Sequence, residues 1–341
     1  MKNKELLCFK YFISTIILGF IVLVLIEYMS VKKDPFFDNE KLRRNIMPLL
    51  AAEDIVEIKI NHALNTPRYD IGLFGNSRII SLSKNDIGFP QKRFFNFGVG
   101  ATSFRTSVRT IERLHELGKL PQVVVISFDN LQVMQPPRPP LYQGFINRWA
   151  DASGDILYAI KHNNAPLENI LLHIKYESKR LLLMFKSARF RYLIHYWILP
   201  IYATHHTYRT DGGLPESLPE KRKTFKPIQE YAPLFPALNL DMKKIGRIAR
   251  DNETRIIVYE SPLHPALIRY YRENPNPNAV VRLESFKQAC IENGLECYLA
   301  PIFNDDLEPP FWNDSSHAPA AILGSFVSSL IKGERRGLPV R

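Results

Sequence analysis

Residues 103–128, SFRTSVRTIERLHELGKLPQVVVISF, join a helical pattern to an apolar run. In the first part, Val108, Ile111 and Leu114 recur at helical spacing, and a glycine at position 118 ends the pattern. The closing residues, QVVVISF, are almost continuously apolar. Such a strand is typical of a parallel sheet that is buried on both faces. This stretch therefore predicts a helix followed by a buried parallel strand.

The same alternation of strand and helix patterns continues on both sides of this stretch. Further apolar runs of strand length are YDIGLF (69–74), RFFNFGV (93–99), RIIVYES (255–261) and LECYLAPIF (295–303). Further helical patterns are LDMKKIGRIARDN (240–252), RLESFKQACIENG (282–294) and APAAILGSFVSSLIKG (318–333). Together they predict an α/β fold, namely a three-layer α/β/α sandwich with a mainly parallel sheet over residues 68–341.

Residues 135–240 break this alternation and are predicted to be an insertion of helices and loops. Part of the insertion, residues 167–202, is both apolar and basic. Its charged residues recur too often for a membrane-spanning helix. Two interpretations remain open: a helical lid packed over the edge of the sheet, or a basic amphipathic helix that rests on a membrane.

The N-terminal segment YFISTIILGFIVLVLIEYM, residues 11–29, is long and apolar enough to span a bilayer as a helix. Three lysines precede it, and no small-x-small cleavage site follows it. We predict an uncleaved transmembrane signal-anchor at residues 1–30 and a juxtamembrane linker at residues 31–67. The large domain is then expected on the extracytoplasmic, or periplasmic, side of the membrane.

The chain has 341 residues, of which 45% are hydrophobic, and a formal net charge of +11. This charge could serve nucleic-acid binding, but the sequence has no nucleic-acid motif and no basic patch interleaved with aromatic residues. Basic residues gather near the N-terminus and in the middle of the chain, which fits an anionic membrane surface. We therefore expect a membrane association and no nucleic-acid partner.

The three cysteines have no metal-like spacing, and their odd number argues against a disulfide framework. A disulfide between Cys290 and Cys297 remains an alternative if the domain lies outside the cytoplasm. Buried free thiols are the simpler expectation, because free cysteine is among the most buried residue types. No metal or organic cofactor is predicted.

Ser77 lies in the triplet Gly-Asn-Ser that follows the first predicted strand. In an open parallel sheet, ligand sites lie at the carboxyl ends of the strands. The serine there has two interpretations. It could cap a following helix, since serine is a preferred N-cap residue. It could instead be a nucleophile whose own backbone N–H points at a developing oxyanion.

A nucleophilic serine needs a base and a group that orients the base. The late segment FWNDSSHAPAA, residues 311–321, places Asp314 three residues before His317. It follows the last predicted strand, so it belongs to a loop at the same edge of the sheet. We predict that folding brings His317 to Ser77, with Asp314 holding the imidazole.

These motifs resemble the SGNH, or GDSL-type, hydrolase superfamily, and more narrowly its membrane-anchored branch associated with acyl modification of cell-envelope polymers. The family's first block, Gly-x-Ser, matches the triplet ending at Ser77, and its last block, Asp-x-x-His, matches Asp314 and His317. The second block is an Asn followed by a Gly whose N–H joins the oxyanion hole. It resembles NFGVGATS, in which Gly100 is the expected donor and Gly98 the alternative.

One block departs from the family. The third block, Gly-x-Asn-Asp, supplies an asparagine side chain to the oxyanion hole, but the chain reads Ser-Phe-Asp-Asn at 127–130. By register Asp129 replaces the asparagine, and a carboxylate there would repel an oxyanion. Asn130 takes the role if the loop is shifted by one residue.

The resemblance implies a membrane-anchored serine acyl-ester hydrolase or O-acyltransferase that acts on an acylated cell-envelope glycan or a similar ester. Ser77 would be the nucleophile, with N–H groups of Ser77 and Gly100 and the side chain of Asn130 as the oxyanion hole. A membrane-bound O-acyltransferase is the partner that the resemblance implies. The alternative is a catalytically silent SGNH-fold protein that serves envelope polysaccharide assembly or binding. A flavodoxin-like nucleotide binder ranks last, because GNSR is too short to cradle a phosphate.

Overall fold

The computed structural model describes residues 52–100, 102–129, 208–214, 238–274, 277–300, 317–334 and 338–340, and a few single positions elsewhere. Apart from such positions, the predicted anchor and most of the predicted insertion lie outside the described residues, as do Asn130 and Asp314. Among the described residues, no helix is both long enough and apolar enough to cross a membrane.

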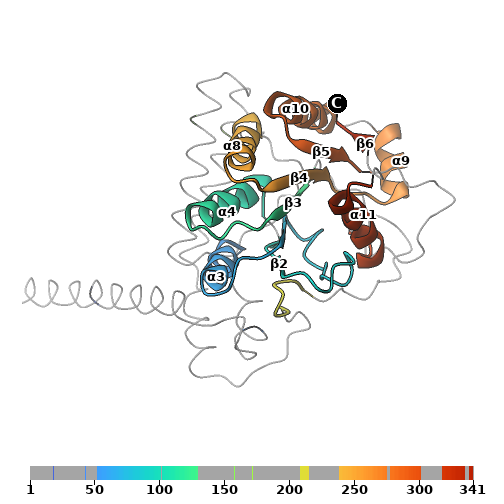
Figure 1. Cartoon of the computed structure of the whole chain (residues 1–341). Helices are drawn as coiled ribbons and strands as arrows, with labels where there is room; N and C mark the ends of the chain where they lie inside the picture. The colour runs from blue at the N-terminus through green and yellow to red at the C-terminus, as the bar shows by residue number, and fades with distance from the viewer. Residues whose placement is uncertain are drawn as a thin grey trace, which may run out of the picture.

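A sheet of five parallel strands forms the centre of the fold, in the order β2-β1-β3-β4-β5 (Figure 1). The strands are β1 (Ile71–Phe74), β2 (Phe94–Asn96), β3 (Val123–Phe128), β4 (Arg255–Glu260) and β5 (Glu296–Leu299). A short β6 (Leu338–Pro339) pairs antiparallel with β5 at the edge. The predicted parallel α/β sheet is thus confirmed, and its strand order is consistent with SGNH and flavodoxin-like folds.

Helices cover both faces of the sheet (Figure 1). One face packs against α3 (Ala52–Leu64), α4 (Phe104–Glu116), α8 (Leu238–Asp251) and α10 (Pro277–Asn293). The other face packs against α11 (Ala320–Lys332), while α9 (Pro265–Glu273) follows β4. Alternate residues of one strand enter the two cores: Val124 and Ile126 face α4, and Val125 faces α11. The continuous apolar run in β3 follows from this burial on both faces.

The order of the strands determines where a ligand site is expected. The chain passes from β1 to one neighbour, β2, and then crosses back to β3 on the other side of β1. Such a switch point opens a crevice at the carboxyl ends of the strands, which is where open α/β sheets bind their ligands. Ser77 follows β1 at this point.

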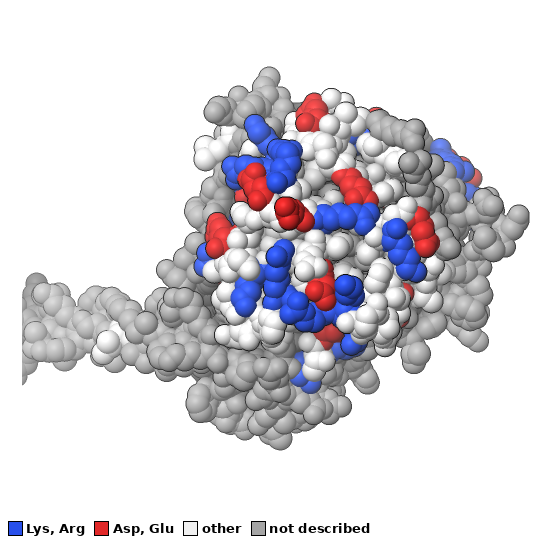
Figure 2. Space-filling view, in the orientation of Figure 1, with Lys and Arg blue, Asp and Glu red and all other residues white. Residues whose placement is uncertain are grey.

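Charged side chains of both signs are interspersed over the described part of the surface in view (Figure 2). Several are paired, for example Lys244 with Glu112 at 3.1 Å and Arg255 with Glu296 at 2.6 Å. The expected absence of a nucleic-acid partner stays a prediction.

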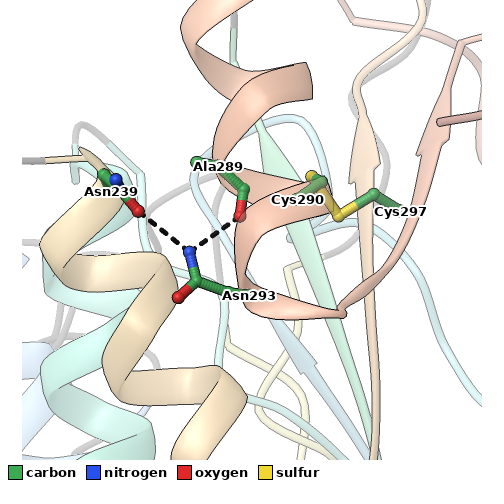
Figure 3. Close-up of a disulfide and its surroundings, with 5 residues drawn as sticks. All are labelled: Asn239, Ala289, Cys290, Asn293 and Cys297. Atoms are coloured by element: carbon green, nitrogen blue, oxygen red, sulfur yellow. Dashed lines mark hydrogen bonds between the residues drawn. A yellow bond between two sulfur atoms is a disulfide. The ribbon is translucent and has the colours of Figure 1, made fainter. Parts of the chain in front are cut away.

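The expectation of free thiols is wrong, because Cys290 and Cys297 form a disulfide (Figure 3). Cys290 lies near the end of α10 and Cys297 in β5, and the left-handed backbone at Gly294 reverses the chain between them. Their Cα atoms are 6.1 Å apart, within the normal range for a disulfide. The sequence left this bridge open, but the odd number of cysteines, which includes Cys8, favoured free thiols.

Removing the disulfide by Cys290→Ala together with Cys297→Ala should lower the free energy of unfolding by roughly 2–3 kcal/mol. The bridge closes a short loop, so its absence gives the unfolded chain more conformational freedom. Urea denaturation of both proteins measures the difference. Dithiothreitol should lower the urea midpoint of the wild type and leave that of the double variant unchanged. A wild-type midpoint that does not change with the reductant contradicts the prediction.

Candidate active site

Ser77 and His317 contact each other although 240 residues separate them. The Oγ atom of Ser77 lies 2.8 Å from Nε2 of His317, a distance at which an imidazole can take a proton from a hydroxyl. Ser77 follows β1, and His317 lies three residues before α11; Ala318 and Ala320, the first residue of α11, are buried in the core. Both side chains are only partly buried, so the pair is accessible from solvent.

The turn after β1 presents the Ser77 side chain. Gly75 has φ of 152°, and a Cβ atom there would collide with Oγ of Ser127 on the neighbouring strand. Asn76 then closes a tight turn, because its Oδ1 accepts a hydrogen bond from the backbone N–H of Arg78 at 3.0 Å. Residues 77–81 form turns and not a helix. The interpretation of Ser77 as an N-cap, and the helix start it assumed, are therefore wrong.

The two glycines of the second block have different surroundings. The N–H of Gly98 donates to the Asn96 side chain at 2.9 Å, so it is not available to a substrate. Gly100 lies beside Ser77, since a Cβ atom built on it would be 3.9 Å from the Cβ of Ser77. Within the part of the chain that the structure describes, no hydrogen bond occupies the N–H of Gly100 or of Ser77. Both groups are therefore still open to a ligand, whereas the N–H of Gly98 is already occupied.

Asn96, which opens the second block, is fully buried and joins this block to the turn after Ser77. Its Nδ2 donates to the carbonyl oxygens of Ile79, Ile80 and Leu82 at 2.9, 3.3 and 3.0 Å. The backbone adds to this contact, because the N–H of Val99 donates to the carbonyl of Gly75 at 2.9 Å. The Ser77 turn and the Gly98–Gly100 segment are therefore held together as one unit.

Asp129 does not stand as an isolated negative charge in the site. Its carboxylate accepts a hydrogen bond from Nδ2 of Asn76 and pairs with the guanidinium of Arg78 at 2.8 Å. The side chains of Arg78 and Asp129 are only 7% and 11% exposed. The opposite charge of Arg78 offsets the repulsion that the sequence predicted for Asp129.

Three buried hydroxyl groups lie on the adjoining strand ends, on Ser127, Tyr259 and Ser261, and none has a hydrogen-bond partner in the described structure. Ser127 and Tyr259 are opposite each other in the register of β3 and β4. Burial, and secondarily the charge of Asp129, raise the pKa of Tyr259 far above its ordinary value. The phenol is therefore neutral at any physiological pH and adds no charge to the site.

Sequence reasoning missed Lys59, which lies on α3 in the predicted linker. Its side chain is fully buried, and its Nζ donates to the carbonyl oxygens of Asn96, Gly98 and Gly212 at 2.9, 2.5 and 2.7 Å. Burial lowers the pKa of the Lys59 ammonium well below its usual value, and the Asp211 carboxylate acts in the opposite direction. The only sequence signal was a lysine between isoleucines, IKI at 58–60, which reads equally well as a solvated position.

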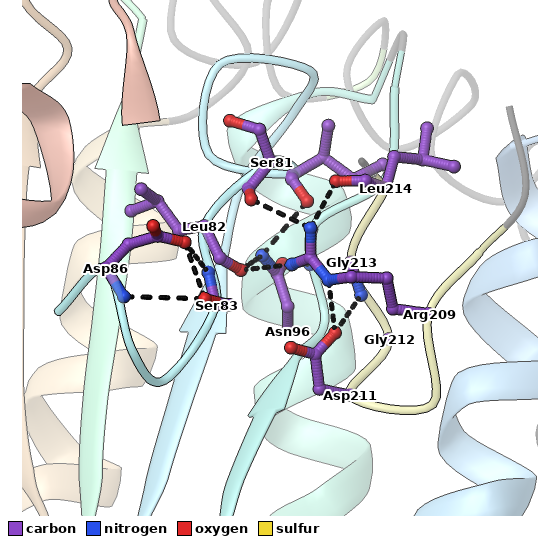
Figure 4. A network of polar contacts seen from close by, with 12 residues as sticks. Ser81, Leu82, Ser83, Asp86, Asn96, Arg209, Asp211, Gly212, Gly213 and Leu214 are labelled. Carbon is purple, nitrogen blue, oxygen red and sulfur yellow. Dashed lines mark hydrogen bonds and ion pairs between the residues drawn. The ribbon is translucent and has the colours of Figure 1, made fainter. Parts of the chain in front are cut away.

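The segment 208–214, which falls within the predicted insertion, also contacts the chain around Ser77 and Asn96 (Figure 4). Arg209 donates to the carbonyl oxygens of Ser81 and Leu82 at 3.0 and 2.8 Å, and it pairs with Asp211 at 3.0 Å. The N–H of Asn96 donates to the carbonyl of Asp211 at 2.7 Å. This part of the insertion thus contacts the second block and the turns that follow Ser77.

The remaining predicted site residues, Asp314 and Asn130, lie outside the described residues. Comparison with models of known protein families finds no match, and neither does comparison with curated proteins. The fold itself gives the class: a parallel sheet with strand order 2-1-3-4-5 is an α/β architecture, and this order is consistent with SGNH and flavodoxin-like folds.

Proposed function

We propose that the protein is a serine acyl-ester hydrolase or O-acyltransferase. One observation carries the proposal: Oγ of Ser77 and Nε2 of His317 are 2.8 Å apart at the carboxyl edge of a parallel sheet. A serine hydroxyl is a weak nucleophile until an adjacent base takes its proton. This pair meets the geometric requirement for that transfer.

In the proposed first step, Oγ of Ser77 attacks the ester carbonyl carbon while Nε2 of His317 takes the hydroxyl proton. The carbonyl oxygen becomes an oxyanion, and the N–H groups of Ser77 and Gly100 donate to it. When the intermediate collapses, the bond to the leaving alcohol breaks and His317 returns the proton to that alcohol. The acyl group is then bound to Ser77 as an ester.

In the second step, water or a sugar hydroxyl attacks the acyl-enzyme, and His317 takes the proton of the attacking group. Collapse of this intermediate returns the proton to Oγ of Ser77 and releases an acid or a new ester. Asp314, three residues before His317 in the sequence, is proposed to orient the imidazole and to stabilise its protonated form. Asn130 is proposed as a third oxyanion donor. The reaction as proposed requires no metal or organic cofactor.

The proposed substrate is an acylated cell-envelope glycan or a similar ester, and the proposed partner is a membrane-bound O-acyltransferase. Both come from the resemblance to membrane-anchored SGNH proteins. The disulfide supports the proposed periplasmic location, because disulfides persist mainly in oxidising compartments. The apolar segment at residues 11–29 supports anchoring to the membrane.

A fluorophosphonate probe tests the proposal on the full-length protein in detergent. The probe should label the wild type covalently, and Ser77→Ala should abolish labelling because the probe reacts only with an activated serine. Ser325→Ala, at an exposed position on α11, is the matched control and should label like the wild type. A folded wild type that resists labelling would favour the alternative, a catalytically silent protein of envelope polysaccharide assembly or binding.

A further inference from the structure

Asp129 contacts the residues on both sides of Ser77 in the sequence. One carboxylate oxygen accepts a hydrogen bond from Asn76, and the other pairs with Arg78 at 2.8 Å. Asn76 also accepts a hydrogen bond from the backbone N–H of Arg78 at 3.0 Å, so each of these three residues contacts the other two. Ser77 is thereby held between two neighbours that share one anchor.

Asp129 adjoins a central strand of the sheet, whereas the turn that carries Ser77 is irregular. Asp129 directly follows β3, the strand that pairs with both β1 and β4. The pairing extends to the last residue of β3, because the N–H of Ser261 donates to the carbonyl of Phe128 at 2.9 Å. The turn at 76–81 is itself neither strand nor helix, and the Asn96 side chain of β2 contacts its later part, from Ile79 onward. Contacts from Asp129 therefore fix the turn to the middle of the sheet.

A buried ion pair is costly to desolvate, so it stabilises a fold little compared with apolar residues of the same volume. Its specific contribution is geometry, because a guanidinium and a carboxylate hold each other in defined directions. Here that geometry acts on the residues adjacent to the proposed nucleophile. A nucleophile displaced by about 1 Å can lose about 10²-fold in rate.

We propose that Asp129 is a positioning residue: through Asn76 and Arg78 it holds Oγ of Ser77 against Nε2 of His317. This inference rests on the proposed function for its kinetic consequence, but the positioning itself is structural. It also reverses the expectation from the family pattern. If Asp129 merely stood where an oxyanion-hole asparagine belongs, Asp129→Asn would restore that donor and raise the rate.

The test is the Asp129→Asn variant, because the two interpretations predict opposite signs. Positioning predicts that fluorophosphonate labelling and the kcat for p-nitrophenyl acetate fall by about 10- to 100-fold, with KM nearly unchanged. Asp241→Asn is the matched control, since it breaks another buried Arg–Asp pair. In that pair Asp241 of α8 lies 3.0 Å from Arg105 of α4. Measured on folded protein, this control should react at the wild-type rate. Asp129→Asn at or above that rate would overturn the proposal.

A second readout does not depend on activity. In protein labelled with ¹⁵N, the Nε2 signal of His317 should shift in Asp129→Asn toward its position in Ser77→Ala, where the hydroxyl is absent. If this shift occurs in a protein that no probe labels, the proposed function fails and the positioning inference stands. An unmoved signal overturns the inference. Arg78→Lys covers the case in which Asp129→Asn does not fold: it keeps the buried charge but loses the planar fork, so the signal should again shift.

Discussion

Replacing His317 with glutamine should lower the rate of Ser77 acylation by about 10⁴- to 10⁶-fold. The imidazole is the group 2.8 Å from the hydroxyl, and a glutamine amide cannot take the proton at any useful rate. The fold should persist, because the ring is only partly buried while the adjoining Ala318 and Ala320 retain their core contacts. The release of p-nitrophenol from p-nitrophenyl acetate at saturating substrate measures the loss.

His115→Gln is the matched control for this prediction. His115 lies in the last turn of α4 and is also partly buried, but it belongs to the helix layer on the other face of the sheet. Its replacement should leave the acylation rate unchanged. A fall of less than about tenfold in His317→Gln would show that another group acts as the base, since general-base catalysis contributes about 10² or more.

Replacing Lys59 with methionine should lower the free energy of unfolding by about 3 kcal/mol, because buried carbonyl groups without a donor cost about 1–3 kcal/mol each. Three such groups depend on Nζ of Lys59, and the removal of a buried charge offsets part of their loss. Urea denaturation measures the change. Lys244→Met is the control: that lysine is 38% exposed in its pair with Glu112, and an exposed pair is worth at most about 1 kcal/mol.

The Lys59 substitution should also change how stability depends on pH. Burial lowers the pKa of Lys59 in the folded protein below the value of 10.5 expected in the unfolded chain. Between these two values the unfolded state binds more protons, so the stability of the wild type should rise with pH in this window. Lys59→Met should lack that rise when unfolding is compared at neutral pH and near pH 10. An equal rise in both proteins would contradict the assignment.

Much of the fold was predictable because its signals are local. The apolar run in QVVVISF and the spacing of Val108, Ile111 and Leu114 identified a buried strand and the helix before it. The parallel sheet followed from the alternation of such segments. The disulfide was not predictable from the number of cysteines, because the turn at Gly294, and not the count, brings Cys290 to Cys297.

The candidate site was predictable only in outline. Sequence position placed Ser77 and His317 in loops at one edge of the sheet, which is where the structure brings them together. The same reasoning left Gly98 and Gly100 both open as oxyanion donors. The choice between them depends on the Asn96 side chain, which occupies the N–H of Gly98, and no spacing rule contains that information.

By itself, the sequence determined the class of the fold and the segments that would meet at its carboxyl edge, since hydrophobic periodicity acts within one helix or one strand. Only the tertiary structure decided the partners of the buried polar groups: Arg78 and Asn76 for Asp129, and three carbonyl groups for Lys59. The physical reason is that a buried charge must find its partner wherever the packed chain brings one close. Residues far apart in the sequence, such as 59 and 212, are then joined by contacts that no local pattern records.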